Sequence, residues 1–160
     1  MAAITRAATA ARPAGGHHAA RGPAPAGDRP QVPSPQVLGT LRIAGERRNV
    51  ARARAFVADR LGPDHPYLDA AVLLCSELVT NAVLHTDSGR ADGMVTLVLL
   101  RTGDAIQVEV TDDGSVTNPV VKDEVLVPEG HGLFLVEQLA DGWGYLRDGR
   151  ATTVWFRLTG

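Results

Sequence analysis

The chain has 160 residues, and 44% of them are hydrophobic, which is enough for one domain with a sizeable core. Its formal net charge of −2 at pH 7 excludes a general binder of nucleic acid or another polyanion, because such binding needs a concentrated basic face. The only lysine is Lys122, so the sequence contains no Gly-Lys-Ser/Thr phosphate loop. Cys75 is the only cysteine and has no partner for a disulfide, which fits a small buried side chain in a reducing compartment.

Residues 1–36 consist mainly of Ala, Pro, Gly and Arg. Such a segment cannot bury enough hydrophobic surface to offset the entropy of ordering, so we expect a disordered tail followed by one domain at residues 37–160. We recognise neither a hydrophobic run long enough to cross a bilayer nor a signal-peptide segment. A cytoplasmic protein without a membrane partner is therefore expected.

The first predicted elements are a strand at residues 37–43 and a helix that Asn49 caps and that ends at Leu61, before Gly62-Pro63. The outer face of this helix carries the arginines Arg47, Arg48, Arg52, Arg54 and Arg60. A solvated surface is the default explanation of these charges, and a surface that binds a partner is the alternative.

A second, longer helix is expected to open at Pro66 and to end at His85. Its core-facing stripe consists of Leu68, Ala71, Val72, Cys75, Leu78, Val79 and Ala82. Glu77, Asn81 and His85 follow one another at four-residue spacing on a different face of the helix.

The neighbours of this polar row are hydrophobic, namely Leu73, Leu74 and Leu84. One interpretation is a helix that is buried on two sides and contains a few satisfied polar groups. The other is a half-covered pocket in which a carboxylate and an amide oxygen converge on one ligand. Such oxygen ligands suit Mg²⁺, which takes the rest of its shell from water and phosphate.

Two further strands are predicted at residues 94–101 and 105–112, joined by a turn at Thr102-Gly103-Asp104. In the second of them Asp112 follows the alternation of the core-facing residues. A carboxylate on the buried side of a strand end is costly unless it is hydrogen-bonded. Asp112 is therefore a candidate ligand-binding residue, and the alternative is an Asp that begins a turn.

The segment from Gly114 to Gly132 is too long for a hairpin loop, and long loops inside domains are usually functional lids. A helix from Gly132 to Asp141 follows it, with Leu133, Val136 and Ala140 facing inward. The chain ends in a predicted hairpin of residues 143–146 and 152–158, in which Thr152 faces the core as Asp112 does.

Four motifs occur in order along the chain. They are Glu77-x-x-x-Asn81-x-x-x-His85, Asp112-x-Gly114, Gly130-x-Gly132-Leu133-x-Leu135-Val136 and Thr152-Thr153-Val154. Together they resemble the nucleotide site of the GHKL ATPases, which have histidine-kinase-like ATP-binding domains. Within that group the chain is most similar to the anti-sigma factor serine/threonine kinases, especially short single-domain regulators of actinomycetes. The resemblance covers roughly residues 41–158.

The resemblance implies an α+β fold of the Bergerat type, a two-layer sandwich with a mostly antiparallel mixed sheet and helices on one face. It also implies ATP and Mg²⁺ as cofactors. The implied ATP-binding residues are Asn81, His85, Asp112, Gly114, Gly130, His131, Gly132, Leu133 and Thr152.

Among these residues, Asn81 would coordinate Mg²⁺, and Asp112 would accept a hydrogen bond from the adenine amino group with support from Thr152. Glu77 would act on the attacking hydroxyl or water. Gly130, His131 and Gly132 would border the phosphates. His85 either lies near the phosphates or has a structural role at the helix end. Arg52 resembles an arginine that contacts protein partners.

Two functions remain open. The first is a kinase that transfers the γ-phosphoryl group of ATP to a serine or threonine of an antagonist protein. The second is a module that captures a sigma factor or an antagonist under the control of ATP, without phosphorylating it. A homodimer is compatible with either function. Val116 replaces the second glycine found in sensor kinases, which bears on the hinge of the lid. No upstream phospho-accepting His is recognised, so a complete sensor kinase is not expected, whereas a detached ATP domain stays possible.

Overall fold

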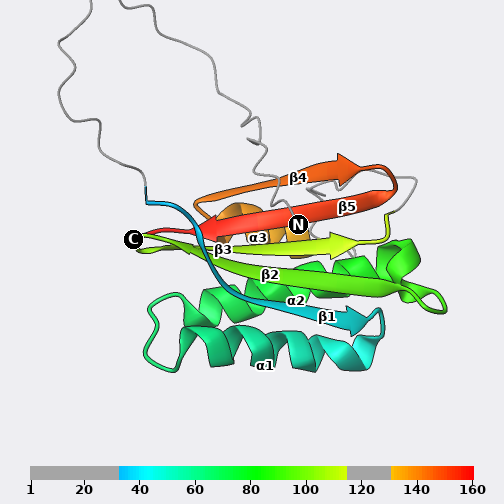
Figure 1. The fold of residues 1–160 in the computed structure, drawn as a ribbon, viewed down its shortest axis with the longest axis horizontal. Helices are drawn as coiled ribbons and strands as arrows, with labels where there is room; N and C mark the ends of the chain where they lie inside the picture. The colour runs from blue at the N-terminus through cyan, green and yellow to red at the C-terminus, as the bar shows by residue number, and fades with distance from the viewer. Residues whose placement is uncertain (1–32, 115–130) are drawn as a thin grey trace, which may run out of the picture.

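A computed structural model describes residues 33–114 and 131–160 of the chain. In this part, five strands form one sheet in the order β1-β2-β3-β5-β4. The strands are β1 (Gln36–Ala44), β2 (Met94–Thr102), β3 (Ala105–Asp112), β4 (Gly142–Asp148) and β5 (Ala151–Leu158). Helices α1 (Val50–Leu61), α2 (Leu68–His85) and α3 (His131–Leu139) lie on one side of the sheet, with α2 between the other two (Figure 1). Short 3-10 helices precede α1 and follow α2, at Arg47–Asn49 and Asp87–Gly89.

The expected α+β sandwich with helices on one face is confirmed. All four described strand pairings are antiparallel, so the parallel pair that a mixed sheet implies is absent from the described strands. The reason is that β4 and β5 form a hairpin through Gly149, which has a φ of 62°. The hairpin brings β5 back alongside β3 in the opposite direction.

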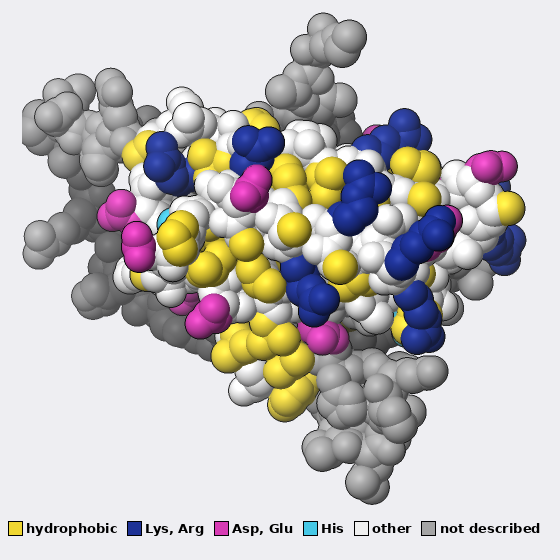
Figure 2. All heavy atoms as spheres, turned by 90° about the horizontal axis from the view of Figure 1, so that it is seen from below, with side chains coloured by type: hydrophobic (Ala, Val, Ile, Leu, Met, Phe, Trp, Pro, Cys, Tyr) yellow, Lys and Arg dark blue, Asp and Glu magenta, His cyan; other side chains and the backbone are white. Residues whose placement is uncertain are grey.

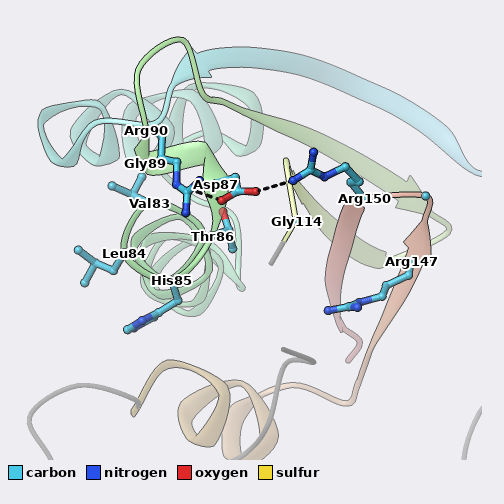
Figure 3. Close-up of a pocket in the computed structure, with 11 residues that line it drawn as sticks. Val83, Leu84, His85, Thr86, Asp87, Gly89, Arg90, Gly114, Arg147 and Arg150 are labelled. Atoms are coloured by element: carbon cyan, nitrogen blue, oxygen red, sulfur yellow. Dashed lines mark hydrogen bonds and ion pairs between the residues drawn. The ribbon is translucent and has the colours of Figure 1, made fainter. Parts of the chain in front are cut away.

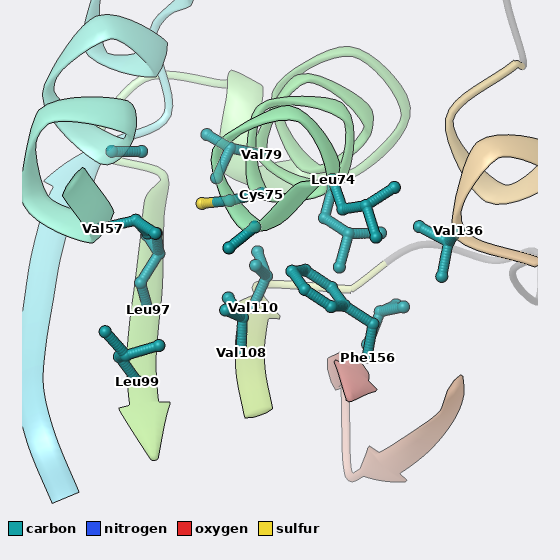
Figure 4. Close-up of a cluster of buried hydrophobic side chains, with 14 of the residues drawn as sticks. Val57, Leu74, Cys75, Val79, Leu97, Leu99, Val108, Val110, Val136 and Phe156 are labelled. Atoms are coloured by element: carbon teal, nitrogen blue, oxygen red, sulfur yellow. The ribbon is translucent and has the colours of Figure 1, made fainter. Parts of the chain in front are cut away.

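The core lies between the sheet and the helices, because buried and less buried residues alternate along the strands. The buried strand residues include Val95, Leu97, Leu99, Ile106, Val108, Val110, Val154, Phe156 and Leu158. Each of these strands therefore turns one face toward the helices, as a period of two requires. Phe156 rises from β5 toward Leu74 of α2 and Val136 of α3 (Figure 4). Burial of one such side chain contributes about 1.5–3 kcal/mol relative to exposure.

Helix α2 is the central element of the core. Its buried residues are Ala71, Leu74, Cys75, Leu78, Val79 and Ala82. Leu74 was expected beside the polar row, but its side chain is fully buried. The buried arc of α2 is wider than the predicted stripe because α1 and α3 cover its two flanks and the sheet covers the side between them.

By length and by a mean hydropathy of 1.4, α2 has the properties of a membrane span, contrary to the expectation from the sequence. The burial of its side chains in the protein core accounts for the same composition.

Two predicted helix starts are wrong in detail. Asn49 directly precedes α1, but its side chain does not cap the helix and instead donates from Nδ2 to the carbonyl oxygen of Ala44, at 2.9 Å. Asn49 is buried, and this bond ties the turn before α1 to the end of β1. Helix α2 begins at Leu68, two residues after Pro66. The C-terminal stop of α1 is confirmed, since Gly62 has a φ of 84° and its N–H bonds to Ala58.

Several predictions lie outside the described residues, namely most of the tail at residues 1–36, the segment around Val116 and Pro119, and Gly130. Within the described part, β1 begins at Gln36, one residue before the predicted start of the domain.

Candidate functional site

The polar row on α2 keeps the geometry that its spacing predicts. Glu77 and Asn81 are half-buried, and His85 is exposed as the last residue of the helix. Residues four apart in an α-helix are neighbours on one face, so the Glu77 carboxylate and the Asn81 amide lie one turn apart. The row thus leads from the middle of α2 to its C-terminal end.

At that end of the molecule the sheet presents a buried polar pair. Asp112 is 7% exposed and Thr152 is 3% exposed, and they lie directly opposite each other on β3 and β5. The expected orientation of both side chains toward the core is confirmed. The backbone N–H of Gly114 donates to Oδ1 of Asp112 at 2.6 Å. The buried carboxylate is therefore held by its own strand end rather than left without a partner.

The ionisation of Asp112 is balanced by opposing influences. Burial raises the pKa of Asp112 above its ordinary value, and the hydrogen bonds from the backbone N–H groups of Gly114 and Thr152 lower it. The negative charge of Asp113 raises the pKa of Asp112 further, and the positive charge of Arg147 lowers it. The net result is a raised pKa of Asp112, because burial is the largest of these influences.

Gly114 is required by its surroundings. Its φ is 89°, a conformation that residues with a side chain rarely adopt, and a Cβ there would overlap the carbonyl oxygen of Arg150. The carbonyl oxygen of Gly114 accepts a hydrogen bond from the backbone N–H of Asp87 at 2.8 Å. Gly114 therefore joins the end of β3 to the turn after α2 and to the β4–β5 turn, and it positions Asp112.

A cavity of about 790 Å³ opens beside Gly114, within the usual size range of small-molecule sites (Figure 3). Its lining consists of Val83, Leu84, His85, Thr86, Asp87, Gly89, Arg90, Gly114, Arg147, Gly149 and Arg150. Asp87 pairs with Arg90 at 3.2 Å and with Arg150 at 3.3 Å. The lining contains three arginines and one carboxylate, so the cavity wall is electropositive and suits an anionic ligand such as a nucleotide.

Some of the predicted site residues are brought together here. His85 and Gly114 line the cavity, and Asp112 and Thr152 lie at the strand ends behind Gly114. Glu77 and Asn81 do not line the cavity, and they lie about two turns and one turn before His85 on α2, respectively.

The other predicted residues lie elsewhere. Leu133 is 7% exposed and packs into the core from α3. His131 and Gly132 are the first residues of α3, and Gly130 lies outside the described residues.

Arg52 is exposed on α1. On the face of the molecule seen from the α1 side, Lys and Arg side chains are dispersed among hydrophobic and neutral atoms rather than gathered into one patch (Figure 2).

Four charged residues that line the cavity belong to none of the sequence motifs, namely Asp87, Arg90, Arg147 and Arg150. Arg147 could have been found from the register of the final hairpin. With Gly149-Arg150 as the two-residue turn, Arg147 pairs with Thr152, so both side chains lie on the same face of the sheet. Asp87 and Arg90 belong to a polar loop whose contacts depend on the folded chain.

Among the described residues, no group of three or more His, Cys, Asp or Glu side chains is arranged to hold a metal ion. Mg²⁺ in nucleotide sites needs only one or two protein oxygens, because phosphate and water supply the others. The half-buried Asn81 amide, one turn after the Glu77 carboxylate, fits that requirement.

Comparisons with known proteins agree with this geometry. Residues 43–158 match the model of the histidine kinase-like ATPase domain. The serine-protein kinase RsbW of Listeria monocytogenes is 27% identical over 124 residues, which are 70% of this chain and 72% of that protein. RsbW of Listeria innocua has the same identity and coverage.

A solved structure of the RsbU and RsbW domains of Rv1364c from Mycobacterium tuberculosis aligns with a TM-score of 0.53 and 23% identity. This alignment covers 74% of this chain and about a third (32%) of that longer chain, and it supports the fold. The resemblance to kinases of the anti-sigma factor type is confirmed by the RsbW relatives. Because the domain match spans most of the described residues, the chain belongs to the family of histidine kinase-like ATPase domains.

Proposed function

We propose that this protein is an ATP-binding regulator that transfers the γ-phosphoryl group of Mg·ATP to a serine or threonine of a small antagonist protein. The observation that carries the proposal is the buried Asp112 carboxylate, held by Gly114 beside a cavity that adjoins the end of the polar row on α2. Asp112 thus provides a polar group for the base of a nucleotide, and the polar row on α2 provides polar groups for its phosphates. We call these two parts of the site the base end and the phosphate end.

The base end selects for adenine. An ionised carboxylate only accepts hydrogen bonds, so Asp112 pairs with the exocyclic amino group of adenine and opposes the carbonyl of guanine. Thr152 supports the same edge of the base from the neighbouring strand.

The phosphate end depends on α2. The Asn81 side-chain oxygen would hold Mg²⁺, and the bound cation would supply neutralisation of the charge on the phosphates. The Glu77 carboxylate, one turn earlier, accepts the proton of the attacking serine or threonine hydroxyl. His131 and Gly132 at the start of α3 add backbone N–H groups and the positive end of a helix dipole near the phosphates.

The expected partners rest on the resemblance to anti-sigma factor kinases, and the relatives named serine-protein kinases support a protein substrate. We propose a sigma factor and its antagonist as the proteins that this chain contacts in the cytoplasm, with Arg52 on the exposed face of α1 in the contact. These contacts with a sigma factor and an antagonist are compatible with a homodimer of this chain.

The alternative function is a module that captures a sigma factor or an antagonist under the control of ATP, without phosphotransfer. The dispersed charges on the α1 face do not decide between the two, since both require a protein contact.

Incubation of the full chain with γ-labelled Mg·ATP and candidate antagonists tests the proposal. Labelled antagonist is expected with the parent. With Glu77→Gln, labelling should be lost while ATP binding remains, because the amide cannot accept the proton. If the parent binds ATP and captures an antagonist but labels none, the binding-module function is correct and the kinase function is wrong.

A further inference from the structure

Asp112 belongs to a row of three side chains across three strands. Arg147 on β4 pairs with Thr152 on β5, and Thr152 pairs with Asp112 on β3. Residues directly opposite each other in antiparallel strands point to the same face of a sheet. Arg147 therefore shares the helix-covered face and the same end of the sheet with the buried polar pair.

The spacing suits an interaction across the row. Neighbouring strands lie about 4.8 Å apart, so the backbones of Arg147 and Asp112 are separated by roughly 10 Å, and the long arginine side chain spans much of that distance. The Arg147 side chain lines the cavity and extends from β4 toward it in Figure 3. The arginine is thus placed to act on the carboxylate through space.

Other charged groups surround Asp112. Asp113 follows it on the same strand and opposes its ionisation. On the cavity wall, His85 ends α2, and Asp87 pairs with both Arg90 and Arg150. On α3, Glu137 is exposed.

The ion pairs of Asp87 offset part of the charge of Arg90 and Arg150. Burial raises the pKa of Asp112, the backbone N–H groups of Gly114 and Thr152 lower it, and Arg147 is the cation that lowers it further, against the rise caused by Asp113.

We propose that Arg147 is a positioning residue of the base end, whose charge keeps the Asp112 carboxylate ionised and so sets the lower pH limit of ATP binding. The inference rests on the proposed ATP site. Asp112 accepts a hydrogen bond from adenine as a carboxylate, so affinity is fully present above its pKa and falls as the pH drops through it. Without Arg147 the pKa of Asp112 rises, so the loss begins at a higher pH.

The test is ATP affinity as a function of pH, measured by competition with a fluorescent ATP analogue from about pH 8 down to about pH 5. Arg147→Ala should move the midpoint of the affinity loss to a higher pH than in the parent, with no more than about twofold change in affinity at the alkaline end. Arg147→Lys should keep the parent midpoint because it keeps the charge.

Arg157→Ala is the matched control. It removes the same charge from β5. Arg157 lies on the opposite face of the sheet from Thr152 and is exposed to solvent. Protonation of ATP itself is common to all variants and cancels in the comparison. In an Asp112→Asn background, removal of Arg147 should no longer move the midpoint.

The outcomes separate this inference from the proposed function. If the parent does not bind ATP, both are wrong. If the parent binds ATP and Arg147→Ala has the same pH profile as Arg157→Ala, the role of Arg147 is wrong and the ATP site stands. An equal loss of affinity at every pH would also overturn it, since it would show that Arg147 does not act through the charge of Asp112.

Discussion

Replacing Gly114 by alanine should lower both the stability of the protein and its affinity for ATP, because Gly114 positions Asp112. Gly114 has a φ of 89°, and a Cβ on it would overlap the carbonyl oxygen of Arg150. Relief of this overlap requires movement of the β3 end or of the β4–β5 turn. Either movement disturbs the N–H of Gly114 that holds the Asp112 carboxylate at 2.6 Å.

The expected magnitude comes from two separable costs. A side chain at this φ lowers the stability of the folded protein by about 1–3 kcal/mol, and forced displacement of a packed neighbour lowers it by about 1–3 kcal/mol more. Gly62 isolates the first cost, because its φ is 84° and a Cβ there would meet nothing within 4 Å. Gly114→Ala should therefore be less stable than Gly62→Ala by about 2 kcal/mol, which is roughly 6 °C in Tm for a chain of this size.

Urea unfolding of the two variants and the parent measures the difference, and calorimetric titration with Mg·ATP measures the effect on the site. Gly114→Ala should lose about tenfold in ATP affinity, equivalent to the weakening of one hydrogen bond to a charged group, and Gly62→Ala should lose none. Equal stability of the two variants would show that Gly114 has room for a side chain, and the described contact with Arg150 would be wrong.

Three further predictions concern base selectivity, the tail and the cysteine. Competition binding should show that ATP is preferred over GTP by about 2 kcal/mol, roughly thirtyfold, and that Asp112→Asn loses ATP affinity and narrows this gap. An unchanged ATP-to-GTP ratio in that variant would make Asp112 a turn residue. Deletion of residues 1–36 should leave ATP affinity intact by the same assay, and its loss would show that the tail is part of the site. Burial raises the pKa of Cys75 to about 12, so its thiol should react with an alkylating reagent at about pH 8 only as fast as the protein unfolds. Rapid labelling of the native protein would contradict that burial.

The strands were predictable from the sequence because a period of two directly reports which face is buried. The alternation of Ile106, Val108 and Val110 extends to Asp112, and that of Val154 and its neighbours extends to Thr152. The parity of each strand therefore placed both polar residues on the buried face without knowledge of the pairing.

What the sequence could not show depends on contacts between distant segments. The burial of Leu74 follows from the cover that α1 and α3 give to the flanks of α2, which no local pattern encodes. Asn49 has the residue type and position of a cap, but the bond from its side chain to Ala44 prevails once β1 lies next to the turn. The place of Arg147 in the site depends on the register of the final hairpin.

The most direct test of the account is a calorimetric titration of the full chain with ATP, with and without Mg²⁺. It should be performed on the parent and on Asn81→Ala, and circular dichroism should confirm that both are folded. The parent should bind ATP in the presence of Mg²⁺, and Asn81→Ala should bind Mg·ATP about tenfold or more weakly, because the amide oxygen that holds the cation is missing. Equal affinity of the two proteins for Mg·ATP would contradict the assignment of the polar row on α2 to the nucleotide.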